Sequence, residues 1–376
     1  MTRRVLALVV LLVSMVAASA EPVTLRFATF NAALSDNEAG AILARLQGGR
    51  DRQAKLVAET IQRVRPDILL LQEIDRDPEG LALRVFMDQY LAVSQNGAAP
   101  LAYTDIVFPP SNTGVATGLD LNGDGRRDGP ADARGFGHHK GQYAFALLST
   151  VPLGTPRTFA SLLWRDMPGN RLPKGHYGAA AEAVLPVSSK THLVVPLDLS
   201  PAAGPPVYVI AAHPTPPVFD DDEIDWNGRR NADEIRLIAD LLDPERGAYL
   251  VDDVGGKGPL PASVGAVVMG DLNADPHRGE SLKGAMDPLL ANPLIVDAKP
   301  RSHRGTATAT FNDGMRVDYV LVRPVPESAG TGGRFVVNGE AGVIWPREDG
   351  PLAHLNDASD HRLVFVDTVW QPAGRQ

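Results

Sequence analysis

The sequence predicts a layered α/β domain, and three observations carry this prediction. Short segments rich in Val, Ile, Leu and Phe alternate with segments whose apolar residues recur every three or four positions, as strands alternating with helices do. A chain of 376 residues can bury one large core as a single domain. It has no cysteine, so its stability must come from that core and not from disulfides.

Residues 1–20 have the pattern of a secretory signal. Two arginines at 3–4 precede an apolar run over 5–16, and small residues at 18–20 form a cleavage site. The alternative is an N-terminal membrane anchor, but the run is shorter than the roughly 20 residues that span a bilayer. We therefore expect a secreted or periplasmic protein, residues 21–376, with no stable membrane anchor after cleavage.

The expected strands are short and bounded by turn residues, as strands buried on both faces are. In chain order they cover residues 24–31, 67–73, 143–149, 207–213, 266–271, 316–322 and 361–367. Helical periodicity covers 51–64 and 231–242. Gly- and Pro-rich stretches at 96–141, 150–178 and 323–357 are expected to be surface loops. No composition shift marks a linker, so we expect one domain over 21–376.

Polar residues stand at the ends of several expected strands. One acid, amide or imidazole at a strand end is ordinary, but several suggest a shared site, because ligands of α/β proteins bind beyond the strand ends. The residues are Asn31, Glu73, His213, Asp271, Asn273, Asp318, Asp360 and His361.

These residue types suit the hydrolysis of a phosphate ester. Carboxylates hold a hard divalent cation, while amides and imidazoles bind phosphate and move protons. The chain offers no thiolate nucleophile and no GxSxG motif. For any one position the alternative is an Asp- or Asn-rich turn that only caps backbone groups.

Five short motifs occur in the order found in one family. They are TFN at 29–31, LQE at 71–73, GDLN at 270–273, VDYVL at 317–321 and SDH at 359–361. Each is weak alone, but together the chain resembles the endonuclease/exonuclease/phosphatase superfamily, which includes deoxyribonuclease I. The resemblance implies a four-layer α/β/β/α sandwich in which two mixed sheets pack face to face between helices.

The resemblance also implies roles for the matching residues. Glu73 would be the main ligand of Mg²⁺ or Mn²⁺, helped by Asn31, and Asp360 would bind the same ion or a second one. Asp271 would orient or deprotonate the attacking water. Asn273 would hold a phosphate oxygen.

Two histidines complete the implied site. His361 would contact the scissile phosphate and take part in proton transfer, and Asp318 would fix its tautomer through the other ring nitrogen. His213 matches a second histidine of the family's hydrolases. The chain departs from deoxyribonuclease I at Gly141, where a glutamate supports that second histidine, so His213 is expected to lack its partner.

The loop over 119–135 resembles the start of a Ca²⁺-binding loop, with oxygen ligands at alternate positions and Gly125 at the sharp turn. Ala131 replaces the glutamate expected at the end of such a loop. The alternative is an acidic turn. The candidate ligands of a structural Ca²⁺ are Asp120, Asn122, Asp124, Asp128 and Asp132.

Charge bears on the substrate. The net charge of -9 does not favour a broad nucleic-acid-binding surface, although a local basic groove stays open. Arg229 and Arg230, at the start of an expected helix, are candidate substrate-binding residues, with solvent-facing charge as the alternative.

We therefore expect a metal-dependent phosphodiesterase or phosphatase, and we expect it to be a monomer. Three substrate classes stay open, namely small phosphoesters, DNA or RNA, and phospholipids docked through Trp164, Trp226 or Trp345. The alternative of another kind is a calcium-binding recognition module without catalysis.

Overall fold

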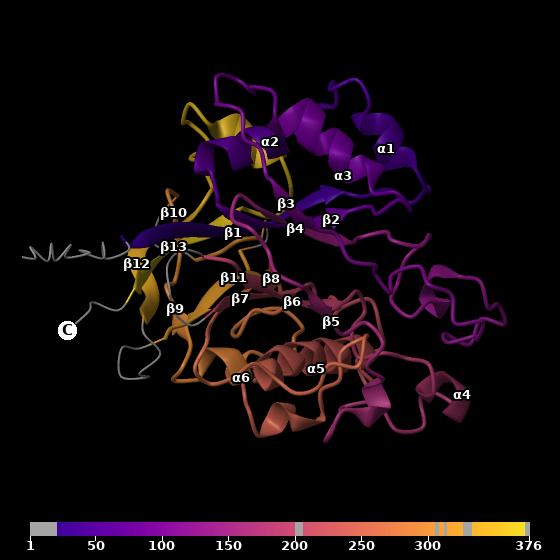
Figure 1. The fold of residues 1–376 in the computed structure, drawn as a ribbon. Helices are drawn as coiled ribbons and strands as arrows, with labels where there is room; N and C mark the ends of the chain where they lie inside the picture. The colour runs from indigo at the N-terminus through magenta and orange to yellow at the C-terminus, as the bar shows by residue number, and fades with distance from the viewer. Residues whose placement is uncertain (1–20, 200–205, 305–307, 312–313, 326–332, 373–376) are drawn as a thin grey trace, which may run out of the picture.

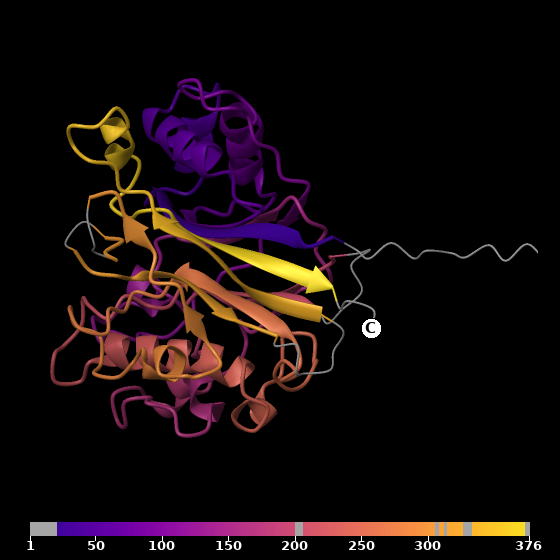
Figure 2. The same cartoon turned by 90° about the vertical axis from the view of Figure 1, so that its left-hand side faces the viewer.

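The computed structural model describes residues 21–199, 206–304, 308–311, 314–325 and 333–372, so the expected signal at 1–20 lies outside the described residues. The strands form two mixed sheets, one of seven strands and one of six. The sheets pack face to face, and helices cover both outer faces (Figures 1 and 2). The predicted four-layer α/β/β/α sandwich is confirmed.

The elements are as follows. The seven-stranded sheet has the spatial order β10 (Arg301–Ser302), β12 (Gly333–Val343), β13 (Val364–Pro372), β1 (Val23–Leu34), β2 (Ile68–Ile74), β4 (Phe145–Ser149) and β3 (Asp105–Val107). The six-stranded sheet has the order β5 (Arg157–Thr158), β6 (His192–Leu197), β7 (Val207–Ala212), β8 (Gly265–Asp271), β11 (Asp318–Arg323) and β9 (Val296–Asp297). The α-helices are α1 (Ala41–Leu46), α2 (Arg52–Val64), α3 (Leu81–Phe86), α4 (Ala179–Glu182), α5 (Trp226–Leu241) and α6 (Asp287–Leu290).

The continuous apolar strands divide their side chains between two cores. On β2, Ile68 and Leu70 point into the core between the sheets, and Leu69 and Leu71 point into the core beneath α1, α2 and α3. This follows from the period of two along a strand. Along β8, alternate side chains point into the core between the sheets and into a third core, which lies beneath α5 and α6. Strands buried on both faces are therefore rigid supports for the residues at their ends.

Side-chain caps begin the two long helices. The Asp51 carboxylate accepts a hydrogen bond from the backbone N–H of Ala54 (2.8 Å) at the start of α2, which confirms the predicted helix. Asp225 accepts from the N–H of Gly228 (3.0 Å) at the start of α5. The helix consequently begins at Trp226, earlier than the predicted residue 231.

The predicted loops were wrong in part. The stretch 96–141 contains β3, 150–178 contains β5, and 323–357 contains β12. The Gly and Asn residues of β12 favour turns, but antiparallel pairing with β13 supplies its hydrogen bonds. β6 was not predicted, and β13 begins at Val364, later than expected. No helix within the described residues is long and apolar enough to cross a membrane.

Candidate functional site

The sheets bring the polar strand ends together. β7 and β8 are parallel, and so are β1 and β2, so the carboxyl ends of each pair share one edge. β11 runs antiparallel to β8 and places Asp318 directly opposite Asp271. Residues from both sheets therefore meet at one site.

Asp271 lies at the centre of this site. Its Oδ2 atom accepts a hydrogen bond from Nδ2 of Asn31 (3.0 Å), and the same amide group donates to Oε1 of Glu73 (3.1 Å). Nε2 of His213 lies 3.5 Å from Oδ2 of Asp271, and Nε2 of His361 lies 3.6 Å from it. One carboxylate oxygen is thus surrounded by an amide and two imidazoles, with a second carboxylate beyond the amide.

His361 and Asp318 form the predicted pair. Nδ1 of His361 lies 3.0 Å from Oδ2 of Asp318, which directs the other ring nitrogen toward Asp271. Burial by itself would lower the pKa of His361, but the charges of Asp318 and Asp271 outweigh it and raise the pKa to about 10. His361 is therefore an imidazolium at neutral pH.

Burial has the opposite effect on the carboxylates. It raises the pKa of Asp271 to about 6, and the nearby Asp318 acts in the same direction while His361 opposes it. Burial also raises the pKa of Glu73, against the hydrogen bond from Asn31. The acid at the centre of the site is consequently tuned toward the range in which it can accept a proton near neutral pH.

The GDLN segment caps its own strand and also carries the site. The Asp271 Oδ1 atom accepts from the backbone N–H of Asn273 (2.9 Å), and Nδ2 of Asn273 donates to the carbonyl of Pro214 (3.1 Å). Asn273 and Glu73 both have a φ of 52°, an uncommon backbone conformation that tends to occur at functional sites. The turn interpretation and the site interpretation thus describe the same residues.

His213 lacks a partner, as predicted. Its Nδ1 atom is buried and has no hydrogen-bond partner within the described part of the chain. Gly141 has a φ of +86°, and a Cβ there would lie 2.3 Å from the carbonyl oxygen of Arg76, so no glutamate fits. Burial and the charges of Lys190 and His361 hold the pKa of His213 well below its usual range. His213 is therefore a neutral hydrogen-bonding group.

Lys190 is a candidate residue that the sequence analysis missed. Its side chain is only 5% exposed, and Glu73 and Asp271 are among the charges that act on it. Burial lowers its pKa, while Glu234, Glu73 and Asp271 oppose that effect. A lysine in the polar segment Ser188–Thr191 shows no sequence signal that distinguishes it from a surface lysine, so only its burial reveals it.

The two predicted substrate-binding arginines contact backbone carbonyls, and their role toward a substrate stays a prediction. Nε of Arg229 donates to the carbonyl of Ile224 (2.7 Å). Arg230 donates to the carbonyls of Val187, Arg134 and Pro186 (3.1, 2.6 and 2.9 Å). Both guanidinium groups hold loop backbone in place, and the acidic Asp225 already caps the start of the helix, so that end does not offer an anion site.

The metal-binding roles expected of Asn31 and Asp360 stay predictions, and the structure shows what the two side chains contact. Oδ1 of Asn31 accepts a hydrogen bond from the N–H of Ala33 (3.2 Å). Its Nδ2 atom donates to the carboxylates of Glu73 and Asp271. Asp360 is exposed, and its nearest described partner is Oγ of Ser359 (3.3 Å). Asp360 is not one of the three residues whose ligand atoms lie within 4.8 Å of one another, although its charge acts on His361.

The acids of the expected calcium loop bind their own loop. Asp120 accepts from the N–H groups of Gly123 and Gly125, Asp124 accepts from that of Arg126, and Asp128 contacts the Arg126 side chain. Asp132 is fully buried and accepts from the N–H groups of Leu121 and Gly129, while Asn122 contacts Asp124. The contacts of the described loop are those of an acidic turn, and Ca²⁺ binding stays a prediction.

Two of the three proposed docking tryptophans are buried. Trp164 is 1% exposed and donates to Asp233, and Trp345 is 8% exposed beneath Arg304 and Arg362. Trp226 stacks on His176. A lipid-docking role for Trp164 and Trp345 is therefore wrong.

The residues present fit a divalent cation. Asp271, Asp318 and His361 have potential ligand atoms within 4.8 Å of one another, the one such group found among the described residues, and its two carboxylates can bind a cation while His361 is an imidazolium. Oδ1 of Asp318 is buried without a hydrogen-bond partner, and Glu73 adds a further carboxylate. Oxygen-rich, negatively charged surroundings of this kind are what hard cations prefer.

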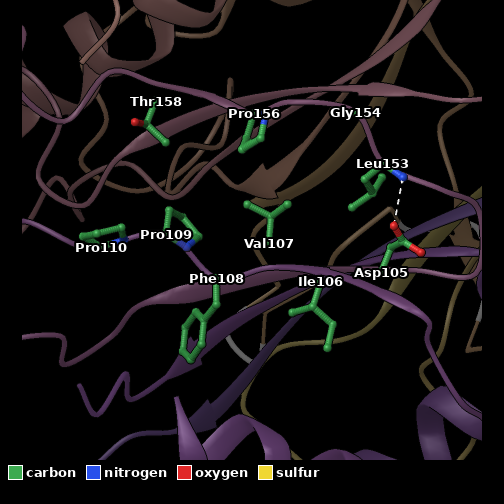
Figure 3. Close-up of a pocket in the computed structure, with 10 residues that line it drawn as sticks. All are labelled: Asp105, Ile106, Val107, Phe108, Pro109, Pro110, Leu153, Gly154, Pro156 and Thr158. Carbon is green, nitrogen blue, oxygen red and sulfur yellow. Dashed lines mark hydrogen bonds between the residues drawn. The ribbon is translucent and has the colours of Figure 1, made fainter. Parts of the chain in front are cut away.

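A separate cavity of about 450 Å³ lies between β3 and the segment 153–158 (Figure 3). Ile106, Val107, Phe108 and three prolines line it, and Leu153 donates to Asp105 at its edge (3.2 Å). None of the predicted site residues lines this cavity.

Comparison with solved structures supports the fold. A solved endonuclease/exonuclease/phosphatase from Beutenbergia cavernae is similar over 93% of this chain and 72% of its own, with 18% identity and a TM-score of 0.54. A family protein from Bacteroides vulgatus (14% identity, TM-score 0.48, 92% and 98% covered) and sphingomyelinase C from Streptomyces griseocarneus (17%, 0.45, 92% and 99%) are more distant. No curated protein matches the sequence.

The family itself is shown by the sequence. The profile described as the Endonuclease/Exonuclease/phosphatase family matches residues 28–361, nearly the whole chain. Members of this family are mostly hydrolases of phosphoester bonds and generally depend on divalent metals. This chain belongs to the endonuclease/exonuclease/phosphatase family.

Proposed function

We propose that this protein is a divalent-metal-dependent phosphodiesterase or phosphatase that works outside the cytoplasm after removal of residues 1–20. The arrangement around Asp271 supports the activity most directly. A carboxylate with its pKa near 6 faces two imidazole Nε2 atoms at 3.5 and 3.6 Å, and one of these rings is held protonated by Asp318. A base and an acid therefore lie beside each other in one site.

Glu73, with Asn31 beside it, would hold Mg²⁺ or Mn²⁺, and the bound ion would stabilise charge on the phosphoryl oxygens. The ionised Asp271 takes the proton from the attacking water. The water oxygen bonds to phosphorus as the bond to the leaving oxygen breaks. His361 donates a hydrogen bond through Nε2 and is the proton source for that leaving oxygen.

Three further groups would bind the phosphate. Lys190 offers positive charge from a buried position, where electrostatic stabilisation is stronger than in water. Neutral His213 and the amide of Asn273 add hydrogen bonds. These groups come from the six-stranded sheet and its loops, and Glu73 and Asn31 come from the other sheet.

The site favours small phosphoesters over nucleic acid. A nuclease needs cations that follow several phosphates along a groove. The chain is acidic overall, and the two arginines expected to contribute are bound to backbone carbonyls. One buried lysine suits a single phosphate.

The test is turnover of residues 21–376 on bis-p-nitrophenyl phosphate, p-nitrophenyl phosphate, supercoiled DNA, RNA and sphingomyelin, each with Mg²⁺, Mn²⁺ or a chelator. Glu73→Gln, with an unchanged melting temperature, serves as the matched inactive variant. Metal-dependent cleavage of the small esters that is lost in Glu73→Gln is the expected result. Turnover by Glu73→Gln at the wild-type rate, or cleavage that continues in the presence of a chelator, would contradict the proposal.

A further inference from the structure

Helix α5 carries two buried polar side chains one turn apart, Asn231 and Glu234, which are 0% and 1% exposed. A buried carboxylate is costly unless hydrogen bonds satisfy it. The partners of these two side chains lie outside the helix, so they show which parts of the molecule this face of α5 holds together.

Glu234 joins two segments that carry site residues. Its Oε1 accepts from the backbone N–H of Ser189 (2.7 Å) and from the Ser189 hydroxyl (2.8 Å). Its Oε2 accepts from the backbone N–H of Thr215 (2.6 Å). Ser189 directly precedes Lys190, and Thr215 follows His213 by two positions.

Asn231 adds the third segment. Its Nδ2 donates to the carbonyl of Thr215 (2.8 Å) and to that of Leu272 (2.9 Å). Leu272 lies between Asp271 and Asn273, and Asn273 itself donates to Pro214 in the same loop. One face of α5 therefore holds the segments 189–190, 213–215 and 271–273.

The charge of Glu234 acts on Lys190, the same residue that its hydrogen bonds help to position. Among the charges that oppose the effect of burial on the pKa of Lys190, that of Glu234 is the largest. The backbone carbonyl of Glu234 also faces Nε2 of His192 (2.9 Å), which anchors the beginning of β6 just beyond Lys190. Position and charge at Lys190 both depend on this one helical residue.

We propose that Glu234, assisted by Asn231, is a positioning residue that sets the phosphate-facing groups Lys190, His213 and Asn273 in register with Asp271. This inference rests on the proposed function. Neither Glu73 nor Asn31 has a hydrogen bond to Glu234 or Asn231 among the described residues, and Asn31 contacts the segment 271–273 through Asp271 (3.0 Å). Metal binding should therefore be independent of Glu234, while phosphate binding and turnover should depend on it.

The variant Glu234→Gln tests the inference. It keeps the shape but replaces one acceptor oxygen with an NH₂ group, which cannot accept from the N–H of Thr215. Asp240→Asn is the matched control, because Asp240 is a buried acid on the same helix whose described partners are Tyr249 and Arg246. Three quantities are measured for each protein: kcat and KM, Mn²⁺ affinity by calorimetry, and the affinity of the Mn²⁺-loaded protein for inorganic phosphate.

For Glu234→Gln we expect kcat to fall about tenfold or more, because small displacements of positioned groups are costly in rate. Phosphate affinity should fall in parallel, with Mn²⁺ affinity unchanged. Asp240→Asn should lower the melting temperature and leave all three quantities near wild type. If Glu234→Gln does not fold, Ser189→Ala is used, because it removes only the hydroxyl contact. It should lower kcat and phosphate affinity by smaller factors and leave Mn²⁺ affinity unchanged.

Equal effects of Glu234→Gln and Asp240→Asn would reduce Glu234 to a structural residue. A parallel loss of Mn²⁺ affinity in Glu234→Gln would contradict the inference that metal binding and phosphate binding depend on residues of different sheets. Wild-type protein that binds Mn²⁺ and phosphate but turns over no ester would contradict the proposed function alone, and the binding comparison would still decide the role of Glu234.

Discussion

Replacing Asp318 with asparagine tests the charge that keeps His361 protonated. The change preserves the size of the side chain and an acceptor oxygen for Nδ1 of His361, which now lies 3.0 Å from the carboxylate. Only the negative charge is lost. If the imidazolium is the active form, activity should be lost from the alkaline side of the pH profile.

The magnitude follows from the pKa of His361. A value of about 10 against an ordinary 6.5 corresponds to roughly 5 kcal/mol in favour of the imidazolium, at about 1.4 kcal/mol per pH unit. Two carboxylates share this effect, and Asp318 is the nearer at 3.0 Å against 3.6 Å for Asp271. Because the carboxylates must also offset burial, which lowers this pKa, Asp318 contributes at least half of the net value, about 3 kcal/mol or more, and its loss moves the alkaline limb down by about two pH units or more, to about pH 8 or below.

The assay is kcat/KM for bis-p-nitrophenyl phosphate across this range at saturating Mg²⁺. Wild-type activity should rise through an acid limb no higher than about pH 6, where Asp271 ionises, and fall only toward about pH 10. Asp297→Asn, which breaks an ion pair between β9 and Arg316, two residues before β11, is the control for general loss of stability. A lower plateau with an unmoved alkaline limb in Asp318→Asn would refute the reasoning.

Four other predictions follow from single substitutions. Lys190→Met should reduce kcat/KM by about 10²-fold, as removal of one charge-stabilising donor does, and a loss below threefold would exclude Lys190 from the site. Gly141→Ala should lower the melting temperature sharply, because the new Cβ would lie 2.3 Å from the Arg76 carbonyl; a stable variant would mean that the backbone can shift there. Asp132→Ala should destabilise the protein with or without Ca²⁺, since Asp132 accepts two backbone hydrogen bonds. Asp124→Ala should lower the melting temperature only when Ca²⁺ is present, and an equal effect in chelator would exclude Ca²⁺ from the loop.

Local patterns were sufficient for the elements with strong periodicity. The apolar run at 67–73 and the helical pattern at 51–64 became β2 and α2 almost unchanged. β12 was missed because its Gly, Asn and Glu residues have low strand propensity, and only pairing with β13 makes that segment a strand. The start of α5 was misplaced because the capping role of Asp225 depends on a turn that the apolar pattern does not mark.

The chemistry of the central residues was visible in the sequence, since Asn31, Glu73, Asp271, Asp318 and His361 stand at strand ends in a family order. The sequence did not show that these residues meet in one site, because the hydrogen bond between Asn31 and Asp271 joins residues 240 positions apart. Tertiary contacts also decided how charged residues are used. They turned Arg230 toward three carbonyls and placed Lys190 beside the acids, two outcomes that residue type alone leaves equivalent. The physical reason is that residue type and spacing record local preferences, whereas burial and pairing depend on which distant segments fold against each other.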